Sequence, residues 1–197
     1  MAQNAPLDCS QQIVTVLTRL DSLVHEETRT SFTETRSSST DQYRLVSSKK
    51  AIVRRVPPDR SIVTLWKNDQ LRLESIEIGN RLWNREPGED WKSEPVASSA
   101  ANRKPNEDAA ARASEARKQL AAQIKNPICH GEVEHNGSRS LQYSYELPLA
   151  TAQLWADMTT LAPIEERIVV ELRGLNAKTT TKRTFSFDNS LTVAAPN

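Results

Sequence analysis

The sequence of 197 residues is long enough for one domain with a sizeable core. Its 26 basic and 25 acidic residues leave a net charge of +1, so no overall field attracts nucleic acid or an anionic membrane. No apolar run approaches the ~18 residues of a membrane-spanning helix. We therefore expect one folded domain that has no integral membrane span and does not bind nucleic acid.

The first predicted element is a helix. Asp8 and Gln11 have the spacing of a capping box, in which each side chain accepts a hydrogen bond from a backbone amide of the first turn. We expect this helix to end near His25, and residues 1–7 before it to be disordered. Apolar residues recur along it at helical spacing, so that one stripe can pack on a sheet; they are Ile13, Leu17, Leu20 and Val24.

A meander of antiparallel strands is predicted next. Gly79-Asn80 supplies the positive backbone angle of a tight hairpin, and the turn at Pro87-Gly88 brings Trp91 back toward Trp83. The polar stretch from Ser93 to Lys104 is expected to be a mobile surface crossover. The strand-like runs before it are rich in β-branched and alternating apolar residues; they are Thr28–Arg36, Tyr43–Val56, Ile62–Trp66 and Leu71–Ile78.

The second half opens with an alanine-rich helix, predicted from Asn106 to just before Pro127. Asn136-Gly137 is the strongest hairpin signal in the chain, and we expect further strands from Cys129 to Phe187. The total is two helices and about 9–11 strands, mostly antiparallel. This predicts a single α+β domain over residues 8–193, with a frayed tail at 194–197.

The two cysteines, Cys9 and Cys129, lack the close spacing of a metal or redox motif, and each lies at the boundary of a predicted element. We interpret them as one disulfide, which indicates an oxidising compartment. Closing so long a loop contributes roughly 4 to 5 kcal/mol if the native geometry is unstrained. The alternative is a pair of buried thiols in a cytosolic protein.

The polar residues give little support for catalysis. None of the three histidines lies at a recognisable spacing from metal ligands or a nucleophile. The neighbours Glu165 and Glu166 point to opposite faces of a strand, and Glu132 with Glu134 is typical of a solvated face. We therefore predict no enzymatic activity, no metal and no cofactor. The histidines are His25, His130 and His135.

The order of parts carries a resemblance to a known family. A cysteine-bearing helix is followed by a meander with Ile-Gly-Asn-Arg-Leu-Trp at 78–83 and Asp-Trp-Lys at 90–92, a crossover helix and a second cysteine. A His-Asn-Gly turn at 135–137, Leu-Trp-Ala-Asp at 154–157, Leu-Ala-Pro at 161–163 and Phe-Ser-Phe at 185–187 complete it. The whole resembles the LolA-like lipoprotein-carrier superfamily, including small proteobacterial periplasmic members of unknown role.

The resemblance implies an incomplete barrel: a strongly curved antiparallel sheet, or half-barrel, whose concave face is covered by two helices. Between sheet and helices it implies a hydrophobic cavity, in which true carriers hold acyl chains. It also implies a periplasmic protein whose signal peptide is absent from this sequence.

Large apolar side chains on one face of such a sheet would present a broad surface to a lipid tail. Alternatively, the same side chains are simply the core between sheet and helices. The candidate ligand-lining residues are Trp66, Leu71, Leu73, Leu82, Trp83, Trp91, Leu120, Ile124, Tyr143, Tyr145 and Trp155.

Four arginines near the predicted hairpins are candidates for pairing with an anionic headgroup at the mouth of the cavity. Alternatively, they belong to a solvated face of the sheet. They are Arg54, Arg55, Arg81 and Arg85.

We therefore predict a monomeric, non-enzymatic periplasmic protein that binds a hydrophobic or acylated ligand, as a lipid or lipoprotein carrier does. The alternative is an envelope protein-interaction module on the same scaffold, with a closed core and an exposed strand edge or apolar patch. A cavity beneath the helices distinguishes the first function from the second.

Overall fold

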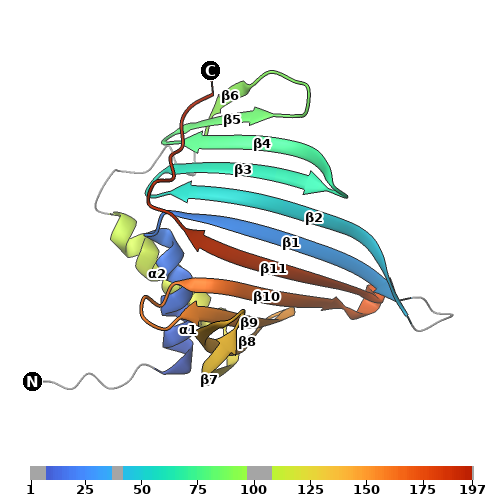
Figure 1. Cartoon of the computed structure of the whole chain (residues 1–197), viewed down its shortest axis with the longest axis vertical. Coiled ribbons are helices and arrows are strands. Elements are labelled where there is room, and N and C mark those ends of the chain that lie inside the picture. Colours follow the sequence, from blue (N-terminus) through green and yellow to red (C-terminus); the bar gives the residue numbers. More distant parts are fainter. Residues whose placement is uncertain (1–7, 37–41, 97–107, 197) are drawn as a thin grey trace, which may run out of the picture.

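The structure is a computed structural model that describes residues 8–36, 42–96 and 108–196. Within them, eleven strands form one antiparallel sheet accompanied by two α-helices (Figure 1). The strand order is β6-β5-β4-β3-β2-β1-β11-β10-β9-β8-β7, so the first and last strands of the chain pair at the centre. The predicted antiparallel sheet with two helices is confirmed, and the sheet is open at β6 and β7.

Each half of the chain contributes a run of sequential antiparallel strands. Tight turns connect β3 to β4 and β7 to β8, and the residues of these turns have positive φ angles. They are Asn68 and Asp69 in the first turn and Asn136 and Gly137 in the second, as predicted for Asn136-Gly137. The first half holds β1 (His25–Arg36), β2 (Tyr43–Val56), β3 (Arg60–Lys67), β4 (Gln70–Ile78), β5 (Arg81–Arg85) and β6 (Lys92–Pro95). The second half holds β7 (Lys125–His135), β8 (Ser138–Leu147), β9 (Ala150–Asp157), β10 (Pro163–Leu172) and β11 (Ala177–Phe187).

Helix α1 (Cys9–Thr18) starts at the predicted capping box, in which the Gln11 amide donates to Asp8 Oδ1 at 2.8 Å. It ends earlier than predicted. A 3-10 turn at Arg19–Asp21 follows it, and His25 already begins β1. The reason is long-range pairing: His25 lies opposite both Phe187 and Arg55 in the sheet, which helical spacing could not reveal.

The predicted crossover is also corrected at its start. Lys92–Pro95 forms β6, which pairs with β5, instead of a loop. Residues 97–104 of that prediction lie outside the described part of the chain, as does the predicted helix start at Asn106. Helix α2 is described over Asp108–Gln123.

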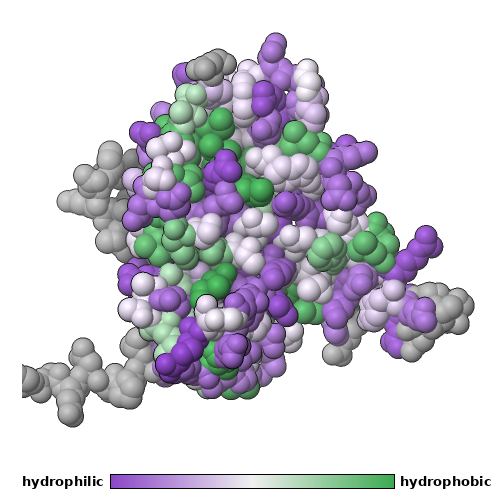
Figure 2. Space-filling model, viewed as in Figure 1, coloured by the Kyte–Doolittle hydropathy of each residue, from purple (hydrophilic) through white to green (hydrophobic). Residues whose placement is uncertain are grey.

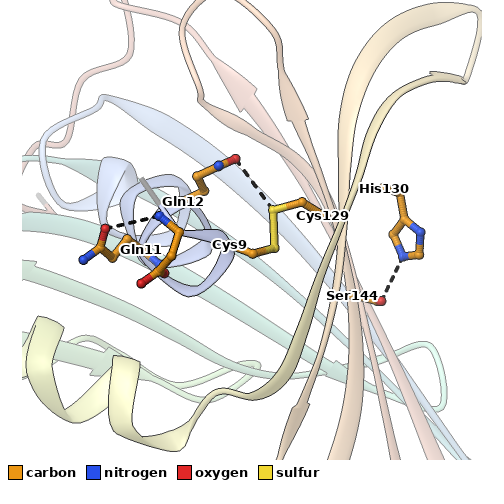
Figure 3. The surroundings of a disulfide bond; sticks show 7 residues. Cys9, Gln11, Gln12, Cys129, His130 and Ser144 are labelled. Carbon is orange, nitrogen blue, oxygen red and sulfur yellow. Dashed lines mark hydrogen bonds between the residues drawn. A yellow bond between two sulfur atoms is a disulfide. The ribbon is translucent and has the colours of Figure 1, made fainter. Parts of the chain in front are cut away.

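The apolar core lies between α1 and the β7–β10 half of the sheet, next to which both helices lie in Figure 1. The predicted disulfide between Cys9 and Cys129 is confirmed, with Cα atoms 5.7 Å apart, and it ties α1 to β7 (Figure 3). Among the described residues, no member of this core cluster comes from β1–β6. Its buried members are Ile13, Val14, Val16, Ile124, Tyr143, Tyr145, Ala152, Leu154 and Ala156.

The outside of the molecule is mixed. Figure 2 shows hydrophobic residues in several small patches, separated by hydrophilic ones. No helix in the described segments is long and apolar enough to cross a membrane.

Candidate ligand-binding face

One row of paired residues crosses the sheet from β7 to β4. Side chains directly opposite each other on neighbouring strands share a face of the sheet. The row starts at Cys129, whose sulfur is bonded to Cys9 of α1, so this side is called the helix face (Figure 3). His130 and Ser144 lie on the other side of these strands, called the opposite face. In order, the row is Cys129, Tyr143, Leu154, Glu166, Arg183, Arg29, Ala51, Leu65 and Leu73.

The row changes character along its length. Beneath α1 it is apolar and closed, because Tyr143 and Leu154 are 2% and 0% exposed. In the middle, on β10, β11 and β1, it is charged. Beyond β1 it becomes apolar again: Ala51 is buried there, but Leu65 and Leu73 are only half-buried.

The charged middle is a continuous network on the helix face. The Tyr145 hydroxyl donates to Glu166 Oε1 at 2.5 Å, and Arg183 Nη1 donates to Glu166 Oε2 at 2.6 Å. Arg183 Nε donates to Glu27 Oε1 at 2.7 Å, and Arg29 Nε donates to the same oxygen at 2.9 Å. Both carboxylates are at most 5% exposed, so each depends on these partners in place of water.

Burial and neighbouring charge oppose each other at Glu27 and reinforce each other at Tyr145. Burial alone would raise the pKa of Glu27, but the hydrogen bonds and charge of Arg183, helped by Arg29, hold that pKa below its ordinary value. Burial, followed by the charge of Glu166 and the hydrogen bond to it, raises the pKa of Tyr145 well above its usual range. At neutral pH, Glu27 and Arg183 of this network are therefore ionised and the Tyr145 phenol is protonated.

The half-buried apolar zone covers the helix face of β2–β5. Its side chains alternate with residues of the opposite face; Val53 pairs with Val63 and Leu65 with Leu73, whereas Leu82 lies opposite Glu77. We call this zone the apolar floor. It consists of Val53, Val63, Leu65, Leu73 and Leu82.

A hollow of ≈ 450 Å³ opens at one end of the apolar floor. Ala51 and Leu65 of the helix face belong to its lining, and Ala51 is 8% exposed. The other lining residues are mostly basic: Arg29, Ser31, Lys49, Lys50, Trp66, Lys67 and Arg72.

The candidate lining residues divide between the two faces. Leu73, Leu82, Tyr143 and Tyr145 share the helix face by register, and Leu120 and Ile124 join the core beneath it. Trp66, Leu71, Trp83 and Trp155 share the opposite face, and Trp91 lies against Arg85 of that face at 4.5 Å. Among these described candidates, the register therefore separates Trp66, Trp83 and Trp155 from Tyr143 and Tyr145.

The four candidate arginines are not brought together either. Arg54 pairs with Glu26 at 2.7 Å and Arg85 with Glu74 at 2.5 Å, both on the opposite face. Arg81 lies over the Trp83 ring at 5.9 Å. Arg55 lines a separate polar hollow near Pro57.

Glu165 and Glu166 point to opposite faces, as expected for neighbours on a strand, and both are buried. Glu165 is 1% exposed on the opposite face, where Lys182 at 2.9 Å and Arg167 at 2.6 Å pair with it. Burial would raise its pKa, but these two cations hold it below its usual value. His135 stacks on Trp155 beside this site, with ring centroids 4.4 Å apart.

Sequence reasoning missed the charged network. Alternation along β10 places Glu166 on the same face as Ile168, which packs against the core, and this was the signal that could have found it. Arg183, which bonds Glu166, is 156 residues away from its other partner Glu27, and only the pairing of β1 with β11 brings these two together.

Comparison with known proteins identifies the fold. No family model matches the chain, and no curated protein matches its sequence. The solved structure of lipoprotein LppX from Mycobacterium tuberculosis matches 94% of this chain and 98% of its own, with a TM-score of 0.56 and 14% identity. LprF from Mycobacterium bovis matches 98% of this chain and 99% of its own, with a TM-score of 0.51 and 14% identity. The chain has a LolA-like fold.

At such low identity the likeness describes the fold alone. It confirms the resemblance drawn from the order of helices, hairpins and cysteines. Within this fold, the helix face of the described residues divides into a closed core, a charged network and a half-buried apolar floor.

Proposed function

We propose that this chain binds a hydrophobic or acylated ligand on the helix face of β2–β5, in the manner of a lipid or lipoprotein carrier. The observation that supports it best is the apolar floor, which is half-buried and continuous with a hollow of ≈ 450 Å³. Ligand sites of small molecules have volumes of about 300–1,000 Å³ and mostly apolar linings. The disulfide supports a periplasmic location, because such bonds persist in oxidising compartments.

The energy available is sufficient. Burying an acyl chain gains about 0.8 kcal/mol per methylene group, so a chain of about twelve methylenes gains roughly 10 kcal/mol before association costs. The closed core under α1 contributes rigidity instead of volume, because Tyr143 and Leu154 already fill it. Of the candidate residues, Leu73 and Leu82 therefore line the proposed ligand site. Leu65, which was not a candidate, lines it with them.

A neutral apolar probe tests this function. N-phenyl-1-naphthylamine becomes fluorescent in apolar surroundings, and we expect saturable binding by the wild-type chain. Leu65→Glu places a carboxylate on the apolar floor and should weaken the probe's affinity at least tenfold. Thr64→Glu, the neighbouring half-buried residue on the opposite face, is the matched control and should bind like wild type. The proposal would be refuted if the wild-type chain did not bind the probe, or if both variants lost the same affinity for it.

A second candidate function is supported by an exposed apolar patch near the end of β1 and the start of β2. Phe32, Tyr43 and Leu45 are 42%, 48% and 54% exposed, and their register places them on the opposite face. Exposed apolar patches often mark interaction surfaces, here for an envelope protein partner. If so, Phe32→Ser with Leu45→Ser should abolish capture of such a partner in pull-down experiments and leave probe binding unchanged.

A further inference from the structure

The hollow beside the apolar floor has an unusual charge. Five of its nine lining residues are basic and none is acidic. The chain as a whole has a net charge of only +1, so this concentration is local. The basic residues are Arg29, Lys49, Lys50, Lys67 and Arg72.

Two of these lysines face each other directly. Lys49 on β2 and Lys67 on β3 form a cross-strand pair on the helix face, one step along the strands from the Ala51–Leu65 pair. Both are exposed, and no described carboxylate pairs with either. Like charges directly opposite each other destabilise a sheet, so this arrangement has a cost in the free protein. A bound anion would remove that cost.

The other cations are held in place by neighbours. Arg29 is anchored by Glu27 at 2.9 Å, and Arg72 donates to the side chain of Gln70 at 2.8 Å. Lys50 lies over the Trp66 ring at 5.6 Å. Lys49 and Lys67 are therefore the cations with unsatisfied charge, and Leu65 and Ala51 beside them provide an apolar surface.

We propose that this hollow binds the phosphate-bearing anionic headgroup of an amphiphile whose apolar part lies along the apolar floor. The proposal rests on the proposed function, and it narrows the ligand to an anionic amphiphile oriented with its head at Lys49 and Lys67. It also moves the headgroup site away from the four arginines expected from the sequence, two of which are already paired with glutamates.

The test uses two lysophospholipids with the same lauroyl chain, kept below their micelle-forming concentrations. One carries the anionic phosphoglycerol headgroup and the other the zwitterionic phosphocholine headgroup. Isothermal titration calorimetry of the wild-type chain should show about tenfold tighter binding of the anionic lipid at low salt, since each lysine contributes modestly. The preference should shrink at high salt, because the lysines are exposed.

The variant Lys49→Gln/Lys67→Gln should bind the anionic lipid as weakly as wild type binds the zwitterionic one, and should bind the zwitterionic lipid unchanged. Its melting temperature without ligand should equal or exceed that of wild type, because the like-charge pair is gone. Lys118→Gln/Lys125→Gln removes the same charge from exposed positions at the end of α2 and the start of β7, and should keep the preference.

The possible failures are distinguishable. Equal affinity for both lipids, or a preference that survives Lys49→Gln/Lys67→Gln, would overturn the headgroup site and leave the proposed function standing. Binding of neither lipid would overturn both. If inorganic phosphate bound as tightly as the anionic lipid, the hollow would be a site for small anions, and the proposal of an amphiphilic ligand would be wrong.

Discussion

Arg183 is the residue on which the charged network depends. It bonds both Glu27 and Glu166 on the helix face, and its side chain is 20% exposed. Removing one partner of a buried ion pair leaves an uncompensated charge, which costs more than the pair itself contributes. The residue therefore holds two buried carboxylates in the middle of an otherwise apolar face.

Arg183→Met should lower the free energy of unfolding by about 3 kcal/mol at pH 7, because buried Glu166 loses its cation and Glu27 keeps only Arg29, whose side chain is 46% exposed. Urea denaturation measures this change. Arg167→Met is the matched control, since Arg167 is 46% exposed and its partner Glu165 keeps Lys182. We expect that control to lose less than about 1 kcal/mol. Equal losses in the two variants would contradict the central role of Arg183.

Acid should destabilise the protein through Glu27. The pKa of Glu27 lies below its ordinary value of 4.5 when folded, because Arg183 outweighs the effect of burial. Its contribution to stability is complete above 4.5 and is lost as the pH falls through the lower folded pKa. We expect unfolding free energy to decline below that pH in urea titrations, and less steeply in Arg183→Met. A decline that is identical in the variant would contradict this assignment.

At the scale of elements, the disulfide connects two parts that are otherwise far apart in sequence. Cys9 and Cys129 are 120 residues apart and join the first turn of α1 to β7. Since α1 covers the closed core, the bond constrains the helix against the sheet on which the core depends. Its contribution arises mainly from restricting the unfolded chain.

Cys9→Ser should lower the melting temperature by about 10 °C under oxidising conditions, from a loss of roughly 4 to 5 kcal/mol. Thermal unfolding followed by circular dichroism measures it. In reductant, wild type and variant should melt together, and Cys9→Ser/Cys129→Ser should behave like the single variant. A melting temperature unaffected by Cys9→Ser under both conditions would show that the bond does not form.

Turns and pairing were predictable to different degrees. Asn136-Gly137 and the Asp8–Gln11 capping box act locally, and each forms where local chemistry places it. The end of α1 was not predictable, because His25 belongs to β1 through partners near residues 55 and 187. Local patterns therefore identified the strands and turns but not the order in which the strands pair.

The sequence alone also could not show which face of the sheet each aromatic ring occupies. Alternation shows that Trp155 and Leu154 point in opposite directions, but not which direction leads to α1. Leu154 is the residue that packs beneath α1, and Trp155 stacks on His135 of the opposite face. The tryptophans Trp66, Trp83 and Trp155 lie on the opposite face, whereas the smaller Leu65 and Leu73 occupy the helix face.

At the scale of the whole molecule, the helix face divides into closed, charged and open zones. The closed zone fixes α1, the charged zone is satisfied internally, and the open zone leaves apolar side chains half-buried next to unpaired lysines. Stable folds rarely leave such features uncompensated unless a ligand or partner covers them. Lipid binding by the open zone is therefore the central claim.

Native mass spectrometry of the protein exported to a bacterial periplasm tests that claim most directly. We predict a defined added mass that disappears on solvent extraction, that lipid analysis of the extract identifies as acylated, and that is absent from Leu65→Glu. A bare polypeptide mass, unchanged after incubation with membrane lipids, would contradict lipid binding and favour the protein-interaction function.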